Sequence, residues 1–342
     1  MLESYDGSGE NFNLGQISKK IVESISCDGV THEKLKAIYE KLRTRALAMR
    51  RSAAKQFRER IKSIFRGSLS DPDSNAMQST LRVQDYQITS LYDEAKIFTR
   101  FYAPEENSDT LLVYFHGGGW MQGSVQNDDA FCCKLTDGLK VCTLSVEYRL
   151  APEHPFPVGL NDSVSSYVWA KQGHFGLFKR IYLCGESAGG NLAAASALKI
   201  YNEFPGNHRI DGQILLYPPL SANLFSDSYQ RFGKGHLLTG ELLQNFYYNY
   251  LGKEFEFIDK QNALIFPCSE LDMTKFPKTF IITAGLDPLR SNGEEFAQKL
   301  RRASIPVEYY CFSEALHGFL GYHEIYKNEF SIALTKIKGW LS

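Results

Sequence analysis

The chain has 342 residues, of which 43% are hydrophobic and 13% are aromatic. This composition supplies a sizeable core and excludes an intrinsically disordered chain, while the length allows one large domain with a lid or two small domains. The formal net charge is −1, so we expect no nucleic-acid partner.

The segment from Thr31 to Arg66 is basic, with twelve Lys and Arg against three Glu. Apolar residues recur in it at steps of three and four, which predicts a long amphipathic helix. A lid helix docked on the acidic remainder of the chain is favoured over one that contacts an anionic membrane surface, because such a stripe is normal for packed helices. We assign residues 1–76 to an N-terminal helical cap segment and a polar linker.

Targeting and redox signals are weak. Met1 to Phe12 is polar and acidic, and no later stretch approaches the ~18 apolar residues of a membrane span. The seven cysteines are scattered, with no C-x-x-C pair or Cys/His cluster that indicates a metal site. The prediction is a reduced, cytoplasmic protein that holds no metal.

From residue 77 to 342 the patterns of strands and helices alternate, which predicts a mainly parallel sheet covered by helices on both faces. The predicted strands are 83–89, 96–102, 110–115, 140–146, 180–184, 213–217, 279–284 and 307–312. The predicted helices are 158–172, 191–201, 240–251, 293–303 and 325–340. An aromatic-rich insertion at about 220–275 interrupts the alternation, and we expect it to cover the active-site edge of the sheet.

The pentapeptide Gly185-Glu186-Ser187-Ala188-Gly189 lies between a predicted strand and a predicted helix. That context is typical of a nucleophile elbow, in which a sharp turn exposes the serine hydroxyl at the edge of the sheet. The two glycines lack side chains where the strand and the helix crowd together. By itself the G-x-S-x-G pattern is weak, since its residues are common.

A second motif strengthens this interpretation. His116-Gly117-Gly118-Gly119 follows the strand 110–115, at the position where the same fold builds a backbone oxyanion hole. Two such loops in the expected order indicate a serine hydrolase. His116 itself is predicted to hold the glycine loop in shape rather than to take part in chemistry.

A serine nucleophile needs a base and an acid that orients it, and in this fold the acid precedes the histidine. His317 lies in a loop between the last strand and the last helix, and is favoured over His323, six residues further on. Asp287 ends the preceding strand, and Pro288 follows it. Its rivals Glu314 and Asp272 lie away from that strand end, and a purely structural Asx turn is the alternative role for Asp287.

Several ordered motifs between about Leu111 and Tyr322 resemble the hormone-sensitive-lipase family of α/β-hydrolases, a group of bacterial and mammalian esterases and lipases. The motifs are His116 to Trp120, Glu147 to Glu153 with Pro155-Phe156-Pro157, Gly185 to Asn191, Asp287 to Arg290, and His317-Gly318-Phe319. Two features depart from the family: Glu186 stands where Asp or Thr is usual, and the N-terminal segment is unusually long and basic.

The resemblance implies an α/β-hydrolase fold with a helical cap and no cofactor. It maps the catalytic triad onto Ser187, Asp287 and His317. The oxyanion donors map onto the amides of Gly117, Gly118 and Ala188. The cap of this family restricts substrates to short or medium acyl chains. Its candidate wall residues, for which core packing is an equal alternative, are Trp120, Phe225, Phe246 and Tyr247.

The predicted function is that of a serine carboxylesterase acting on a small-molecule acyl ester. An amidase or an acyltransferase of the same fold stays open, as does the oligomeric state. A ligand receptor built on an inactive hydrolase is disfavoured, because receptors of this kind lose the base and His317 is present. The segment from Glu147 to Arg149 is predicted to be a structural anchor.

Overall fold

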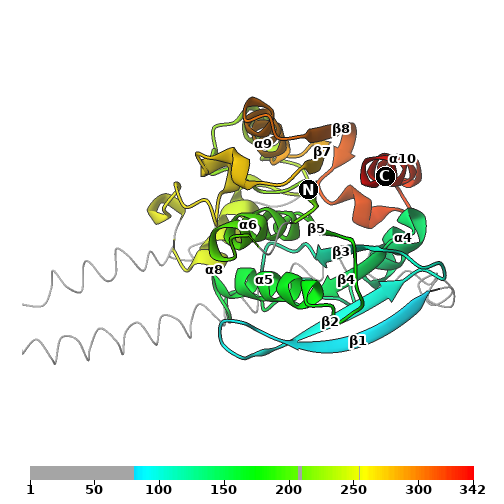
Figure 1. The fold of residues 1–342 in the computed structure, drawn as a ribbon. Helices are drawn as coiled ribbons and strands as arrows, with labels where there is room; N and C mark the ends of the chain where they lie inside the picture. The colour runs from blue at the N-terminus through cyan, green and yellow to red at the C-terminus, as the bar shows by residue number, and fades with distance from the viewer. Residues whose placement is uncertain (1–80, 207–209, 254) are drawn as a thin grey trace, which may run out of the picture. The chain divides into compact units, whose positions relative to one another are not determined.

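The computed structural model describes residues 81–342, except 207–209 and 254. The segment 1–76 and the basic stretch 31–66 within it therefore lie outside the described residues, and the predictions for them stay predictions. In the described part, eight strands form one sheet in the order β1-β2-β4-β3-β5-β6-β7-β8 (Figure 1).

The sheet is mainly parallel, as the alternation of elements predicted. Only the pairs β1–β2 and β2–β4 are antiparallel. The strands are β1 (Arg82–Thr89), β2 (Lys96–Ala103), β3 (Thr110–Phe115), β4 (Cys142–Val146), β5 (Arg180–Glu186), β6 (Gly212–Leu216), β7 (Thr279–Leu286) and β8 (Val307–Leu316). All residues of β3, β4 and β6 are buried, as expected for central strands that helices cover on both faces.

Helices cover both faces of the sheet (Figure 1). They are α4 (Asp129–Leu139), α5 (Val158–Lys171), α6 (Ala188–Glu203), α7 (Asp227–Phe232), α8 (Gly240–Leu251), α9 (Arg290–Arg302) and α10 (Lys327–Leu341). On one face, α4 and α10 contact each other and share a buried cluster with side chains such as Tyr114, Phe280 and Ile337. Helices α5 and α6 contact each other, and α6 and α9 pack against β5 and β7 respectively.

The sequence patterns missed α4. Its residues include two cysteines, a threonine and a glycine near the end, all of which are weak helix formers, although Phe131 and Leu135 are buried. The inserted region between β6 and β7 holds α7, α8 and three short 3₁₀ turns. Helix α8 has the predicted bounds, because Thr239 caps its first turn through Leu242 N and Gly252 ends it in the left-handed conformation.

The parallel strands place their carboxyl ends along one edge of the sheet, where open α/β sheets bind ligands. The residues that directly follow β3, β5, β6, β7 and β8 are His116, Ser187, Tyr217, Asp287 and His317. Five side chains of four kinds, from distant parts of the sequence, therefore start from a common edge. In the part of the chain that the structure describes, no helix is both long and apolar enough to cross a membrane.

Candidate active site

Ser187 occupies a tight turn between β5 and α6. Its φ and ψ are 51° and −120°, a conformation that L-residues rarely adopt. A Cβ on Gly185 would collide with the backbone of Gly189, and one on Gly189 would collide with the Phe115 carbonyl oxygen. The two flanking glycines are therefore required by the close approach of strand, turn and helix, as the pentapeptide predicted.

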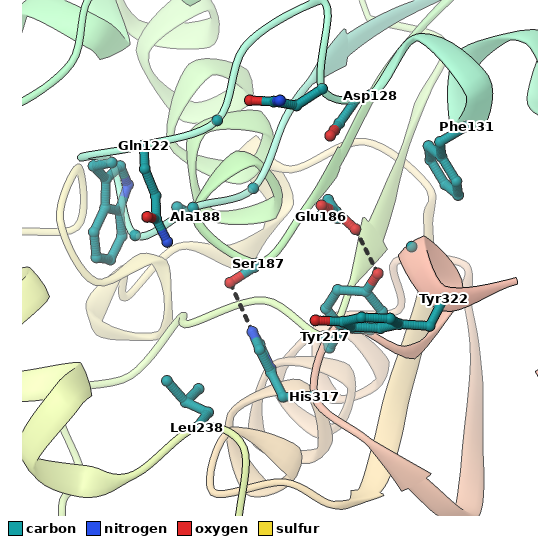
Figure 2. A pocket seen from close by; sticks show the side chains of 18 of the residues that line it. Gln122, Asp128, Phe131, Glu186, Ser187, Ala188, Tyr217, Leu238, His317 and Tyr322 are labelled. Carbon is teal, nitrogen blue, oxygen red and sulfur yellow. Dashed lines mark hydrogen bonds between the residues drawn. The ribbon is translucent and has the colours of Figure 1, made fainter. Parts of the chain in front are cut away.

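A continuous hydrogen-bond relay begins at the serine hydroxyl, and Figure 2 shows its first bond, from Ser187 to His317. Ser187 Oγ lies 2.8 Å from His317 Nε2, and His317 Nδ1 lies 2.7 Å from Asp287 Oδ2. The other carboxylate oxygen, Asp287 Oδ1, accepts the Leu289 amide at 2.9 Å. Asp287 is fully buried, whereas the His317 side chain retains 12% exposure. The structure thus brings together three side chains that were predicted from separate motifs.

The rival residues lie elsewhere. Glu314 is an exposed residue within β8. Asp272 accepts the Thr274 amide at 3.1 Å and so caps a 3₁₀ turn. His323 lies beyond the histidine loop, with Nε2 3.5 Å from Glu324 Oε1. None of the three takes part in the hydrogen-bond relay.

The glycine loop after β3 is held by His116, as expected. His116 is buried, its ring stacks on Tyr148 at 4.2 Å, and its Nδ1 donates to the Gly117 carbonyl oxygen at 2.7 Å. Burial lowers the pKa of His116 to about 4, so the imidazole is neutral at physiological pH. The Tyr148 hydroxyl donates to the His116 carbonyl oxygen at 2.9 Å and fixes the start of the loop.

The three glycines of the loop all line the cavity but differ in backbone conformation and in their neighbours. Gly117 lies against the buried Glu186 carboxylate, whose Oε1 would be 2.7 Å from a Cβ added at Gly117, and its predicted role as an oxyanion donor stays a prediction. Gly118 and Gly119 have φ values of 111° and 61°, and both line the same cavity as Ser187 and Ala188. Such backbone angles strain any residue with a side chain.

Glu186 and Asp128 form an acidic pair in the cavity wall, and Figure 2 shows them on the same side of it. Glu186 Oε2 accepts the Tyr217 hydroxyl at 2.6 Å, and Asp128 Oδ2 accepts the Tyr114 hydroxyl at 2.7 Å. Burial raises the pKa of both carboxyl groups, and for Asp128 the nearby Glu186 raises it further. The wall beside the nucleophile is therefore polar but carries less negative charge than two free carboxylates would.

The cavity over Ser187 has a volume of about 510 Å³, which lies in the range of small-molecule sites. One part of its wall is apolar and comes from α8 and the loop before it, including Leu238, Leu242 and Phe246. The part near the start of α4 is polar and includes Asn127 and Asp128. The site can therefore take an ester with one sizeable apolar substituent.

Of the four predicted wall residues, two line the cavity. Trp120 does so and stacks on Tyr250 at 4.5 Å, and Phe246 packs directly over Gly119. Tyr247 is buried behind Trp120, with their rings 5.1 Å apart, because the next residue along a helix faces about 100° away. Phe225 is 88% exposed and does not line the cavity, since it precedes α7 on the outer side of the insertion.

The segment from Glu147 to Arg149 is an anchor, as predicted. Glu147 Oε2 accepts the Val125 amide at 2.6 Å. The Arg149 guanidinium pairs with the buried Asp162 at 2.6 Å and with Asp93 at 2.7 Å. These bonds join the loop after β4 to α5 and to the turn after β1.

Sequence reasoning missed Tyr217 and Asp128. Tyr217 is the last residue of the predicted strand 213–217 and follows β6 at the same edge as Ser187, so its place at a strand end was an available signal. Asp128 precedes α4, the helix that the patterns missed, so no signal placed it. Within the described ranges, no group of three or more His, Cys, Asp or Glu side chains could hold a metal ion.

Known proteins match this chain in sequence and in fold. A family profile described as α/β-hydrolase fold matches residues 112–321, and one described as steryl acetyl hydrolase matches residues 11–203. An arylesterase of Saccharolobus solfataricus is 30% identical over 73% of this chain and 79% of its own length. The chain belongs to the hormone-sensitive-lipase-like esterase family of α/β-hydrolases.

Further relatives agree with this family. An ethyl acetate hydrolase of Pseudomonas putida is 27% identical over 78% of this chain and 82% of its own length. The solved structure of a Pyrobaculum calidifontis esterase superimposes with a TM-score of 0.73 at 28% identity, covering 84% of this chain and 93% of that one. The chain is accordingly a carboxylic ester hydrolase, and its substrates are small-molecule esters.

Proposed function

We propose that this esterase hydrolyses short-chain acyl esters, with Ser187, His317 and Asp287 as its catalytic triad. The observation that carries the proposal is the relay of two hydrogen bonds, 2.8 Å and 2.7 Å long, that joins the three side chains. Its order of hydroxyl, imidazole and carboxylate is that of a serine hydrolase. The strained turn at Ser187 supports the same role, because such strain concentrates at functional sites.

In the first half of the reaction, Ser187 Oγ attacks the ester carbonyl carbon while His317 Nε2 takes the hydroxyl proton. Asp287 holds the imidazole in the tautomer that can accept this proton and stabilises the imidazolium that forms. The C–O bond then breaks, His317 returns the proton to the leaving alcohol, and an acyl-serine remains. A water molecule attacks this ester by the same route and releases the acid.

The developing oxyanion needs backbone donors that are not already occupied. We assign it to the amides of Gly118 and Ala188, as the sequence predicted, together with that of Gly119 in place of Gly117. All four residues line the cavity beside Ser187, but Gly117 lies against the Glu186 carboxylate, which competes with the oxyanion for its amide. Loss of one such donor typically costs about 10²–10³ in rate.

The acyl group is short and the alcohol is apolar. The bulky rings of Trp120 and Phe246 limit the depth of the cavity next to the glycine loop, while the leucines of the α8 region offer a broader apolar surface. The match to the steryl acetyl hydrolase profile and the likeness to an ethyl acetate hydrolase support an acetyl ester. An acetate of a bulky, apolar alcohol fits both observations.

A series of chromogenic acyl esters tests the proposal, with Ser187→Ala as its control. We expect p-nitrophenyl acetate to hexanoate to exceed palmitate by at least roughly tenfold in kcat/KM, and acetates of cyclic apolar alcohols to be hydrolysed. Ser187→Ala should lose turnover and labelling by an organophosphonate, with an unchanged melting temperature. Wild-type turnover in that variant would contradict the triad, and a preference for palmitate would contradict the short acyl chain.

A further inference from the structure

Tyr217 has an unusual backbone conformation at the carboxyl end of β6. It is fully buried and has a φ of 40°, in the left-handed region that bulky residues rarely adopt. Its amide donates to the Ile282 carbonyl oxygen on β7 at 2.6 Å. Such a conformation persists only where the surroundings fix it, and here it brings the ring into the active site (Figure 2).

The Tyr217 ring contacts the histidine of the relay. The centroids of the Tyr217 and His317 rings are 5.2 Å apart at an interplanar angle of 66°, which is an edge-to-face contact. Phe319, two residues after the histidine, packs against the same tyrosine at 5.7 Å. Tyr217 is therefore a buried side chain against which both the imidazole and the loop after it rest.

The Tyr217 hydroxyl binds the last residue of β5, the strand that leads into Ser187. It donates to Glu186 Oε2 at 2.6 Å, and Glu186 directly precedes Ser187. The same carboxylate lies against Gly117 of the glycine loop. A Cβ on Gly117 would lie 2.7 Å from Glu186 Oε1, so loop and carboxylate fit together without spare room. One carboxylate thus joins the glycine loop, the serine turn and the end of β6.

We propose that Tyr217 and Glu186 act as a positioning pair for acyl transfer, a role that rests on the proposed function of Ser187 and His317. Glu186 fixes the glycine loop relative to the serine, so that the amides of Gly118 and Gly119 stay aligned with the oxyanion. Tyr217 fixes the imidazole and holds Glu186 in place. Neither side chain has to contact the reacting atoms for this role.

Electrostatics adds a second effect of the same pair. Burial raises the pKa of Glu186, while the Tyr217 hydrogen bond and the charge on His317 lower it, so an imidazolium and the Glu186 carboxylate stabilise each other. The other titratable groups that interact with Glu186 belong to β3, the segment before α4, the loop after β4, and β5. They are Tyr114, Asp128, Tyr148 and Cys184.

Three substitutions test the pair. Tyr217→Phe removes only the hydroxyl, Glu186→Gln keeps a hydrogen-bond acceptor but removes the charge, and Tyr102→Phe is the matched control. The control also removes a buried hydroxyl that donates to a carboxylate, Asp129, at 2.7 Å. We expect Tyr217→Phe to lower kcat on p-nitrophenyl acetate roughly tenfold with KM changed less than about twofold, because small misplacements of catalytic groups are costly. Tyr102→Phe should leave kcat within about twofold.

The pH profile separates positioning from a merely structural role. In Glu186→Gln the imidazolium loses a nearby negative charge, so the acid limb of kcat/KM should move to lower pH. Because Tyr217 acts partly through Glu186, the double variant should lose much less activity than the product of the two single losses. Unchanged kcat in both single variants, losses that multiply in full, or losses that merely follow the melting temperature would overturn the proposal.

The failure of the pair is distinguishable from failure of the proposed function. If Ser187→Ala retained turnover and organophosphonate labelling, the catalytic assignment itself would be wrong. If Ser187→Ala is inactive while Tyr217→Phe and Glu186→Gln match the wild type in kcat and in pH profile, the triad stands and the positioning pair is refuted.

Discussion

The two sides of the cavity are built by different means. On the sheet side, Ser187, Asp287 and His317 each directly follow a strand, so the backbone of the sheet sets where their side chains start. On the cap side, Leu238 and Phe246 belong to an insertion whose position depends on side-chain packing. Changes on the sheet side should therefore affect the rate of chemistry, and changes on the cap side should affect the choice of ester.

The largest effect is expected on the sheet side, from Asp287→Asn. Asn can still accept the Leu289 amide, which preserves the turn, but its amide group would face His317 Nδ1 and favour the wrong imidazole tautomer. We expect kcat on p-nitrophenyl acetate to fall by about 10⁴. Thermal unfolding of the variant serves as the control for folding. A loss smaller than tenfold would show that Asp287 has only the structural role of an Asx turn.

Gly119→Ala tests the contact between the two sides, where Gly119 of the glycine loop lies against Phe246 of α8. Gly119 has a φ of 61°, and an added Cβ would collide with the Phe246 ring above it. We expect kcat to fall by about 10²–10³, because the displaced loop no longer presents its amides to the oxyanion. Gly339→Ala, which adds a methyl group to open space on α10, is the matched control and should leave kcat unchanged.

A second substitution sharpens this test. Adding Phe246→Ala to Gly119→Ala removes the collision while the strained φ stays. Recovery of part of the lost kcat would show that the ring of the cap presses on the glycine loop. If the double variant is no better than Gly119→Ala, the backbone strain alone accounts for the loss and the two sides are independent at this point.

The same division explains what the sequence could predict. The three relay residues were identified because each is fixed by its position after a strand, and the order of the motifs follows from the fold. For the wall residues the sequence left core packing as an equal alternative, because Phe246 and Tyr247 are neighbours on one helix and only the packing of α8 decides which ring faces the cavity. Sequence alone left Phe225 and Phe246 equivalent.

The glycine loop shows a finer limit. Motif position could not tell that Gly117 lies against the Glu186 carboxylate, because this depends on a contact between two segments far apart in the sequence. Tyr217 was predicted only as the end of a strand, since the pattern of a strand does not reveal a residue with positive φ. Long-range contacts of single side chains are thus the features of the site that could not be predicted from the sequence.

The buried imidazole under the glycine loop predicts a pH dependence of stability. Burial lowers the pKa of His116 from 6.5 to about 4, so between these values the unfolded chain binds a proton that the folded protein does not. Stability from this group is therefore complete above about pH 6.5 and is lost as the pH falls, by up to about 3 kcal/mol. The free energy of unfolding should fall less steeply in His116→Gln than in the wild type.

Urea denaturation at several pH values between 4 and 7 measures this difference. The variant should be less stable than the wild type near pH 7, because it loses the ring contact with Tyr148, and the gap should narrow as the pH falls. A gap that stays constant over this range would contradict a neutral, buried His116. Comparing the two proteins cancels the opposite contributions of Asp128 and Glu186, whose raised pKa values favour the folded state at lower pH.

The smallest effect is expected on the cap side, where two aromatic residues form a matched pair. Phe246 lines the cavity, whereas Phe225 is exposed to solvent. Phe246→Ala deepens the cavity, so the preference for acetate over longer acyl esters should fall by roughly tenfold in kcat/KM, or about 1.4 kcal/mol. Phe225→Ala should leave the chain-length profile of the wild type unchanged.

The profile, rather than the overall rate, decides whether the cap sets specificity. If Phe246→Ala lowers the rate equally for every ester, the Phe246 ring supports the glycine loop, and the cap side then affects the rate of the chemical step rather than the choice of ester. If Phe225→Ala shifts the profile as much as Phe246→Ala, the insertion must adopt another arrangement when substrate binds. If only Phe246→Ala shifts the chain-length profile, and its kcat on acetate stays within about threefold of the wild-type value, then the cap side sets the choice of ester and the sheet side sets the rate.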